Sequence, residues 1–388
     1  MKILLISHAK DDKNAGASRV YHLLADALRE RGHAVTLYHY DDLRIPRLLS
    51  YVVKRVALPE FISWRFYREA TRDYDVIFCS NGMAHPIFRK LREKSPRPYL
   101  IHHLHGLSYF DYLAVVTERM RGHVDLGFLF LKLKGHFPVK WDAEGARHAD
   151  IIIAQNIRDQ DYIEDQRSRQ EDTGANCAPV VQVPAALHPR LEQAGRNAPP
   201  PETRNPTSLL WFGSWRERKG HAYLGRAFRE VKEQFPDATL TIGGAGGDAA
   251  SVPDSFDVDL RSSVRVLPRI EIDEQIREYY AHGIFIFPSL SEGFGLALIE
   301  AMTMGLACVT TQTGVGSDFI EDGVHAVVVA MASSRHLARG LIRLIRDDAL
   351  RQRIARQGQQ LARQFTVERS VNEYLEIFEK RPQAKVPA

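Results

Sequence analysis

A short segment in the last third of this 388-residue chain constrains its fold more than any other. Ile284–Phe287 is a run of apolar, β-branched and aromatic residues, which is typical of a buried parallel strand. Leu296–Met304 is rich in strong helix formers, and Gly305 follows where a glycine often ends a helix. The glycine-containing turn between them directs backbone N–H groups and the positive end of the helix dipole toward one point. We therefore expect a strand, turn and helix that together can bind an anion.

Two glutamates flank the start of the expected helix, Glu292 in the turn and Glu300 in the helix itself. A carboxylate at this place accepts hydrogen bonds from hydroxyl groups, while the backbone amides bind a phosphate. The arrangement thus suits a ligand that combines a sugar with a phosphate. Taken alone the pattern is weak, because such glycine turns are common in α/β proteins and a glutamate near a helix start is often a surface residue.

The spacing of these residues resembles the signature of the retaining glycosyltransferases of family 4, also called group 1. Glu292 and Glu300 are separated by seven residues, with Gly293–Gly295 after the first and Ala301–Met302 after the second. The resemblance implies an α/β chain with the GT-B fold, in which two Rossmann-like domains enclose a cleft. It covers nearly the whole chain but is specific only in the second half.

A second segment of that half carries positive charge. Ser208–Phe212 is expected to be a strand, and it runs into a turn that begins at Gly213 and ends in Lys219. Backbone donors and an ammonium group are suited to orient and neutralise a phosphate. The turn resembles the family's Gly-Arg…Lys-Gly motif, in which the lysine binds the donor diphosphate, although Ser214 stands here in place of the arginine. Arg216 or Arg218 would then supply the missing charge.

The first half matches the family mainly in architecture. A loop containing Gly16 follows the first expected strand, Lys2–Ile6, and in the family this loop faces the donor phosphates and the acceptor. Here Ala15 replaces one of the family's paired glycines. His105 follows the expected strand Pro98–His102, where relatives place a histidine in the donor-sugar pocket. A hydrogen-bonded structural role is the expectation for His102 and His103.

The resemblance implies catalytic roles for Glu292, Lys219 and His105. It implies that further residues hold the nucleotide sugar, namely Gly16, Gly213, Ser214, Arg218, Lys219, Gly244, Glu292, Gly293, Phe294, Gly295, Leu296 and Glu300. Lys219 and the helix dipole would stabilise the departing diphosphate, Glu300 would bind the ribose, and Glu292 would bind donor-sugar hydroxyls. No metal ligand and no cofactor is expected, because cationic side chains replace a divalent ion. The Asp-x-Asp pairs Asp73–Asp75 and Asp257–Asp259 are treated as coincidental.

Composition and sequence order define the expected domains. Length favours two domains, and three dispersed cysteines with no metal-ligand spacing favour a reducing cytoplasm. A net charge of +4 gives no reason to expect nucleic acid as a partner. The prolines between Pro184 and Pro206 suggest a linker. We expect an acceptor-side domain over residues 1–184, a linker over 185–206, a nucleotide-sugar domain over 207–364, and a terminal helix over 365–388 that returns to the first domain.

The expected activity is transfer of a sugar from an NDP-sugar, UDP- or GDP-linked, to a hydroxyl with retention of configuration. A glycan or lipid-linked glycan of the cell envelope, as in polysaccharide or lipopolysaccharide biosynthesis, is the expected acceptor. Two alternatives stay open: a GT-B sugar-nucleotide epimerase or hydrolase, and a non-catalytic sugar-nucleotide-binding partner of a transferase. A dehydrogenase is excluded because the first strand is not followed by Gly-x-Gly-x-x-Gly.

The first domain also contains an amphipathic pattern. The apolar residues of Ile45–Val56 recur at helical spacing, and Arg47, Lys54 and Arg55 lie on the opposite side. A second apolar and basic segment is Phe128–Lys134. The pattern fits a helix that packs on its sheet, and equally one that rests peripherally on the inner face of an anionic plasma membrane.

Overall fold

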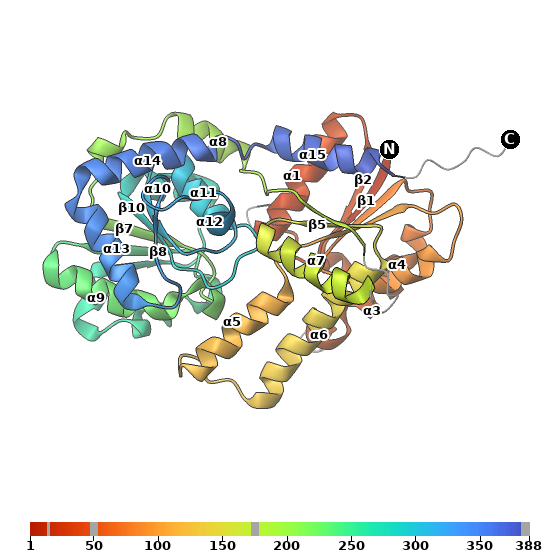
Figure 1. Ribbon diagram of the computed structural model, residues 1–388, viewed down its shortest axis with the longest axis horizontal. Coiled ribbons are helices and arrows are strands. Elements are labelled where there is room, and N and C mark those ends of the chain that lie inside the picture. Colours follow the sequence, from red (N-terminus) through yellow and green to blue (C-terminus); the bar gives the residue numbers. More distant parts are fainter. Residues whose placement is uncertain (14–15, 47–52, 172–177, 382–388) are drawn as a thin grey trace. The chain divides into compact units, whose positions relative to one another are not determined.

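The computed structural model describes residues 1–13, 16–46, 53–171 and 178–381, without the side chains of residues 54, 55, 128–130, 132, 134, 170 and 171. The chain forms two compact units, each built on a six-stranded parallel sheet flanked by helices (Figure 1). Unit 1 comprises Met1–Val116, Asp125–Ala186 and Val367–Ala388, and unit 2 comprises Thr117–Val124 and Leu187–Thr366. The α/β class expected from the sequence is confirmed.

The sheet of unit 1 has the strand order β2-β1-β3-β4-β5-β6. Each strand is an apolar run of three to five residues, and helical segments connect successive strands, as parallel pairing requires. The elements are β1 (Lys2–Ile6), α1 (Gly16–Glu30), β2 (Ala34–Tyr38), η1 (Tyr40–Leu43), η2 (Val53–Ala57), α3 (Leu58–Ala70), β3 (Val76–Ser80), α4 (His85–Arg92), β4 (Tyr99–His103), α5 (Ser108–Met120), α6 (Phe128–His148), β5 (Ile151–Ala154), α7 (Ile157–Glu171), β6 (Val180–Gln182) and α15 (Val367–Glu379).

Alternate residues of each strand in unit 1 enter opposite hydrophobic clusters, because successive side chains of a strand point to opposite faces. Leu4 of β1 and Ile77 of β3 belong to one cluster, together with side chains from α3, α4, α6 and α7. Leu5 and Phe78 belong to the other cluster, which contains side chains of α1 and α15. Figure 1 shows α15, the last helix of the chain, beside α1. Both faces of the sheet are therefore covered.

The sheet of unit 2 has the strand order β12-β11-β10-β7-β8-β9, again with parallel pairing throughout. The two strands predicted from the sequence, Ser208–Phe212 and Ile284–Phe287, are found at those positions. The elements are α8 (Pro189–Arg196), η3 (Pro201–Thr203), β7 (Ser208–Phe212), η4 (Glu217–Lys219), η5 (His221–Tyr223), α9 (Leu224–Gln234), β8 (Thr239–Gly243), η6 (Gly246–Asp248), η7 (Val252–Ser255), η8 (Val258–Ser263), β9 (Val264–Leu267), α10 (Ile272–Ala281), β10 (Ile284–Phe287), α11 (Leu296–Thr303), β11 (Ala307–Thr310), α12 (Val315–Asp318), β12 (Val327–Val328), α13 (Ser334–Arg346) and α14 (Asp348–Ala362).

Unit 2 also separates alternate strand residues between two faces. Trp211 of β7 and Ile286 of β10 pack in a cluster with apolar side chains of α9, α13 and α14. On the other face, Phe212 lies edge-on to Tyr279 of α10, and Phe285 stacks with Phe287. Strand β10 lies inside the sheet, between β11 and β7. The turn that follows β10 therefore lies next to the carboxyl ends of these two strands.

Three segments bear on the sequence predictions. Helix α6 begins at Phe128 and continues through Pro138 to His148, so it includes the apolar and basic segment Phe128–Lys134. The proline-rich segment 185–206 contains α8 and η3. The amphipathic segment Ile45–Val56 lies largely outside the described residues, including the side chains of Arg47, Lys54 and Arg55. Among the described helices, none is both long enough and apolar enough to span a membrane.

Candidate functional site

The turn between β10 and α11 lies against the segment that carries Lys219. The N–H groups of Leu290 and Ser291 both approach the carbonyl oxygen of Arg218, at N–O distances of 2.7 and 3.3 Å. Because β7 and β10 are adjacent parallel strands, the segments after them emerge at the same edge of the sheet. Two segments that are more than 70 residues apart in the sequence thus form one site.

Glycines permit the close approach of these segments. Gly220 has φ +69°, and a Cβ at this residue would lie 2.0 Å from the carbonyl oxygen of Pro288. Gly295 immediately precedes α11 with φ +99°, a left-handed conformation that side chains rarely adopt. Gly314 leaves room for the turn as well, since a Cβ there would lie 2.4 Å from the carbonyl oxygen of Phe294. A larger residue at Gly220 or Gly314 would push the turn apart.

Glu292 is the centre of a buried polar cluster. Lys219 Nζ donates to Glu292 Oε1 at 2.6 Å, and Arg218 Nη1 donates to Oε2 at 3.2 Å. Ser289 Oγ also donates to Oε1, at 2.6 Å. The side chain of Glu292 is only 5% exposed, whereas those of Lys219 and Arg218 are 13% and 27% exposed. Two cations and one carboxylate leave one net positive charge in this three-residue cluster.

The charge state of Glu292 follows from its surroundings. Burial raises the pKa of this carboxyl group, but the nearby charges of Lys219 and Arg218, with hydrogen bonds from Lys219 and Ser289, outweigh burial and lower the pKa below its usual value. Glu292 is therefore ionised at neutral pH, with its oxygens engaged by three donors. A carboxylate held in this way is a good acceptor of hydrogen bonds and a poor nucleophile.

The ends of β7 and β8 provide a second glycine-rich part of this edge. Gly213 N–H donates to the carbonyl of Gly243 at 3.0 Å, and Gly244 N–H donates to that of Leu267 at 3.0 Å. Gly244 has φ +78° and lies close to Gly213, so no side chain of these two residues covers the backbone here. Ser214 is exposed and carries no charge. Of the two arginines that could supply the charge missing at Ser214, Arg218 contacts Glu292, whereas Arg216 is exposed.

Glu300 lies on α11, and its side chain is held by α10. Tyr279 Oη donates to Glu300 Oε2 at 2.9 Å, and Gln275 Nε2 donates to the same oxygen at 2.8 Å. The residue is 2% exposed. These two hydrogen bonds hold the carboxylate of Glu300 against α10. Neither partner was predicted from the sequence, since contacts between α10 and α11 follow from tertiary packing.

The two predicted site residues of the first half of the chain belong to unit 1. Gly16 is exposed at the first residue of α1, and Ala15 lies outside the described residues. The N–H of His105 donates to Asn81 Oδ1 at 3.1 Å, and its ring lies 4.5 Å from that of His103. Burial, followed by the neighbouring histidines, holds the pKa of His105 well below its usual value, so the ring is neutral. Its Nε2 has no hydrogen-bond partner among the described residues.

The other two histidines of this strand differ from each other. His103 Nε2 lies 3.1 Å from Tyr374 Oη of α15, which fits the expected structural role. His102 is fully buried, and neither of its ring nitrogens has a hydrogen-bond partner within the described part of the chain. Burial lowers its pKa to about 3, so this ring is neutral.

In unit 2 the structure gathers the predicted phosphate-binding and sugar-binding residues at one edge. Lys219, Arg218 and Glu292 are in contact, and Gly293–Leu296 forms the turn into α11 beside them. Ser289 completes the cluster but was not predicted, because its role depends on the folded turn. The edge presents cationic side chains, a helix N-terminus and buried carboxylates, which together can bind a phosphorylated sugar.

Comparisons with known proteins identify relatives of the chain. The sequence profile described as "Glycosyl transferases group 1" matches residues 197–361, which lie in unit 2. An uncharacterized glycosyltransferase of Methanocaldococcus jannaschii is 22% identical over 90% of this chain and 86% of its own length. Among solved structures, sucrose-phosphate synthase from Thermosynechococcus elongatus aligns with a TM-score of 0.74 at 18% identity over 98% of each chain. Anabaena HepE in complex with UDP-glucose aligns with a TM-score of 0.67 at 17% identity, over 98% of this chain and 99% of that one.

Proposed function

Because the profile of the glycosyl transferases group 1 matches residues 197–361 and the chain has the GT-B fold, we propose that it transfers a glycosyl unit from a nucleotide-diphosphate sugar to a hydroxyl acceptor. The contact of Lys219 and Arg218 with buried Glu292 carries the proposal. This cluster joins net positive charge to hydroxyl-binding oxygens at the carboxyl ends of adjacent strands. A nucleotide-diphosphate sugar needs both kinds of group.

Lys219 acts on the leaving group. As the bond between sugar and diphosphate breaks, negative charge grows on the diphosphate, and preorganised cations and amides stabilise it. Lys219 and the N-terminus of α11 supply that stabilisation. Arg218 provides the positive charge that the family's arginine would have provided at the position of Ser214. Because these groups neutralise the leaving group, the transfer step proceeds without a divalent ion.

Glu292 binds hydroxyls of the donor sugar, and the reaction proceeds with retention of configuration. Its oxygens already accept bonds from Lys219, Arg218 and Ser289, which disfavours attack by this carboxylate on the anomeric carbon. The acceptor hydroxyl instead attacks from the face that the diphosphate leaves, and the leaving phosphate takes the proton. Glu300, fixed by Tyr279 and Gln275, binds the ribose.

The donor is a UDP- or GDP-sugar, and the solved complex of HepE with UDP-glucose favours the former. In this assignment Gly213 and Gly244 lie beside the nucleotide, and Gly16 and His105 of unit 1 act on the donor phosphates and the sugar. The acceptor is a glycan or lipid-linked glycan of the cell envelope.

Residues of unit 1 are consistent with peripheral contact at the inner face of an anionic membrane. Trp64 of α3 is 77% exposed and lines a groove with Arg89, Lys90 and Lys140. An exposed tryptophan beside basic residues is typical of a membrane interface. The same groove contains Glu60 and Glu144, so its net charge is small.

A donor screen tests the proposed function. The full-length protein is heated with each of a panel of UDP- and GDP-sugars, and with AMP as a control. The true donor should raise the melting temperature in proportion to the logarithm of its concentration. The increase should disappear in Lys219→Ala but persist in Lys232→Ala, which removes a lysine from α9. If no NDP-sugar stabilises the wild type above the AMP control, the assignment of unit 2 as a donor site is wrong.

A further inference from the structure

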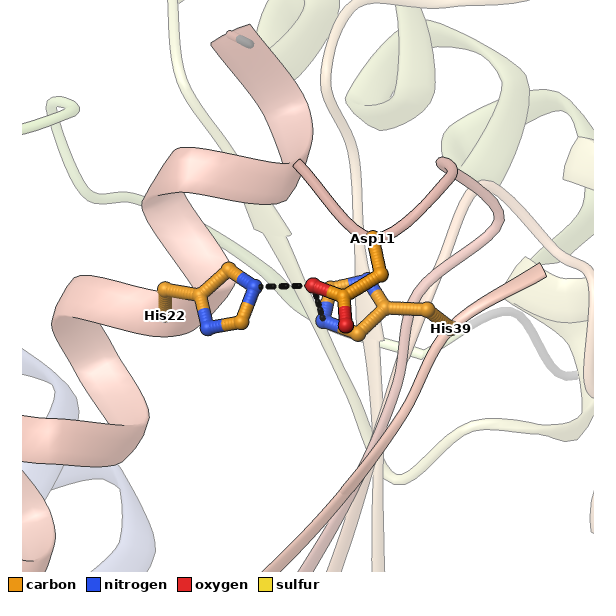
Figure 2. Close-up of side chains that lie close together, drawn as sticks. All are labelled: Asp11, His22 and His39. Carbon is orange, nitrogen blue, oxygen red and sulfur yellow. Dashed lines mark hydrogen bonds and ion pairs between the residues drawn. The ribbon is translucent and has the colours of Figure 1, made fainter. Parts of the chain in front are cut away.

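A second cluster of chemically active side chains lies in unit 1. Asp11 lies in the loop after β1, His22 lies on α1, and His39 directly follows β2. His22 Nε2 is 2.7 Å from Asp11 Oδ1, and His39 Nε2 is 3.8 Å from the same oxygen. Figure 2 shows one carboxylate oxygen of Asp11 joined by dashed lines to both imidazole rings. One ligand atom from each residue lies within 4.8 Å of the other two.

The topology of unit 1 brings these residues together. Strands β1 and β2 are paired in parallel, so the residues after them emerge at the same edge of the sheet. Helix α1 connects the two strands and packs on the sheet, which places His22 beside both loops. The two imidazole rings stack with a centroid separation of 4.7 Å and an interplanar angle of 21°. The cluster is therefore built on regular elements.

One ring nitrogen of the cluster is buried and makes no hydrogen bond among the described residues. His39 is 4% exposed, and its Nε2 has no hydrogen-bond partner among the described residues although it points toward Asp11. A buried polar atom without a hydrogen bond is destabilising, because it has lost its contact with water. An ion between the three side chains would bond to this nitrogen, whose distance to Asp11 Oδ1 is 3.8 Å.

The donor set and its spacing indicate which kind of ion fits. Two imidazoles and a carboxylate are ligands of first-row transition metals, and bonds of about 2.0–2.2 Å in a tetrahedral site place ligand atoms about 3.3–3.5 Å apart. The distances of 2.7 and 3.8 Å from Asp11 Oδ1 lie on either side of that spacing, and all three ligand atoms lie within 4.8 Å of one another, so side-chain adjustments of about 1 Å suffice. We propose that Asp11, His22 and His39 bind a divalent transition-metal ion, with Zn²⁺ the best match.

Neighbouring groups support the three ligands as an outer layer. Ser18 Oγ lies 3.4 Å from Nδ1 of His39, on the ring edge opposite the ligand nitrogen. The N–H of Asp11 donates to Asp41 Oδ2, and the N–H of His39 donates to Asp42 Oδ2, both at 2.8 Å. A partner on the second ring nitrogen orients a metal-ligating histidine in known sites, and the two backbone bonds hold the loop and the end of β2 in place. Access from solvent exists as well, because the side chain of Asp11 is 60% exposed.

The ion joins the loop after β1 to α1 and to the end of β2, and leaves one coordination position to water. It lies in unit 1 and takes no part in the metal-independent transfer step proposed for unit 2. Its effect is on the stability of this loop. Metal binding can therefore be measured separately from donor binding and from turnover.

Direct titration tests the site. Full-length protein without an affinity tag is stripped with a chelator, dialysed, and titrated with Zn²⁺ in competition with a chromophoric chelator. Wild type should bind one ion per chain with a Kd of about 1 µM or lower and melt at a higher temperature with Zn²⁺. Mg²⁺ should not compete, since imidazoles do not favour hard cations. Bound Co²⁺ should give the visible absorption of a low-coordinate site with nitrogen ligands.

Variants assign the ion to these residues. His22→Asn, on a partly exposed helix face, should weaken Zn²⁺ binding at least about 100-fold, and Asp11→Asn should do so about 10-fold or more. His39→Gln should also abolish tight binding, but it alters a buried residue, so the first two variants, checked for folding by circular dichroism, decide the assignment. Asp26→Asn, which removes an exposed carboxylate of α1, is the matched control and should bind as wild type does. Absence of stoichiometric binding to wild type, or equal affinity in His22→Asn, overturns the proposal.

Discussion

Replacement of Lys219 by alanine is the most informative perturbation of the donor site. The ammonium group lies 2.6 Å from Glu292 Oε1 and its side chain is 13% exposed, so it acts in a largely water-excluded environment. Removing one preorganised charge from such a site typically reduces kcat 10²- to 10³-fold, or about 2.7–4 kcal/mol in the transition state. We expect Lys219→Ala to lower kcat by this amount, and Lys219→Arg to recover part of the loss.

The change should leave the fold intact. Breaking a buried ion pair costs about 3–5 kcal/mol when the remaining charge has no other partner. Here Arg218 and Ser289 still donate to Glu292, at 3.2 and 2.6 Å, so the stability lost should lie nearer 1–2 kcal/mol. Thermal denaturation without donor measures this loss. A large drop in melting temperature would mean that Lys219 mainly supports the fold.

A double-mutant cycle separates the two roles of Lys219. If the lysine only neutralises Glu292, its removal should cost little once Glu292→Gln has removed that negative charge. If it stabilises the leaving diphosphate, its removal should still reduce kcat about 10²-fold in the Glu292→Gln background. The assay is steady-state release of nucleoside diphosphate, with kcat and KM resolved. A cost below about fivefold in that background would refute the assignment to the leaving group.

Four further predictions follow from the same structure. Glu300→Ala should weaken donor binding about 10-fold or more while binding of a sugar phosphate that lacks the nucleoside stays unchanged, as measured by calorimetry. Transfer should persist after exhaustive chelation, and complete loss restored by Mg²⁺ or Mn²⁺ would contradict the assignment of charge neutralisation to Lys219. Burial raises the pKa of Asp142 to about 7, so ionisation of this carboxyl group destabilises the folded state increasingly as pH rises from about 4 to about 7. The stability of Asp142→Asn relative to wild type should therefore increase by about 2–3 kcal/mol between pH 5 and pH 8. A stability difference that does not change with pH would contradict the pKa shift. The protein should co-sediment with anionic liposomes at low salt, and Trp64→Ser should co-sediment to a smaller extent. If the wild-type protein does not bind the liposomes, a soluble acceptor is favoured.

The strands could be predicted because each is a short apolar run. In a parallel sheet covered on both faces, the side chains of the inner strands are buried on both sides, and the sequence therefore shows continuous apolar runs such as Ile151–Ala154 and Ile284–Phe287. Helix α6 could not be predicted as one element from the sequence, because Pro138 lies inside it and proline usually marks a helix start or break. The family resemblance, confirmed by the match to residues 197–361, came from the spacing of Glu292 and Glu300.

The partners of the predicted residues could not be read from the sequence. Ser289 lies near Glu292 in sequence but contacts it only because the turn folds back, and Tyr279 reaches Glu300 from a different helix. Asp11, His22 and His39 are separated by intervals that match no metal-binding motif, and β1 pairing with β2 brings them together. Contacts of this kind depend on packing.

The stereochemistry of the first product tests the central claim most directly. Once the donor screen has identified an α-linked NDP-sugar, NMR spectroscopy can follow the anomeric proton of the product formed with a glycan acceptor, or with water before mutarotation. Wild-type protein should release nucleoside diphosphate and give an α-configured product, and Lys219→Ala should give the same product more slowly. A β-configured first product, or turnover that is unchanged in Lys219→Ala, would contradict a retaining transfer that depends on this cluster.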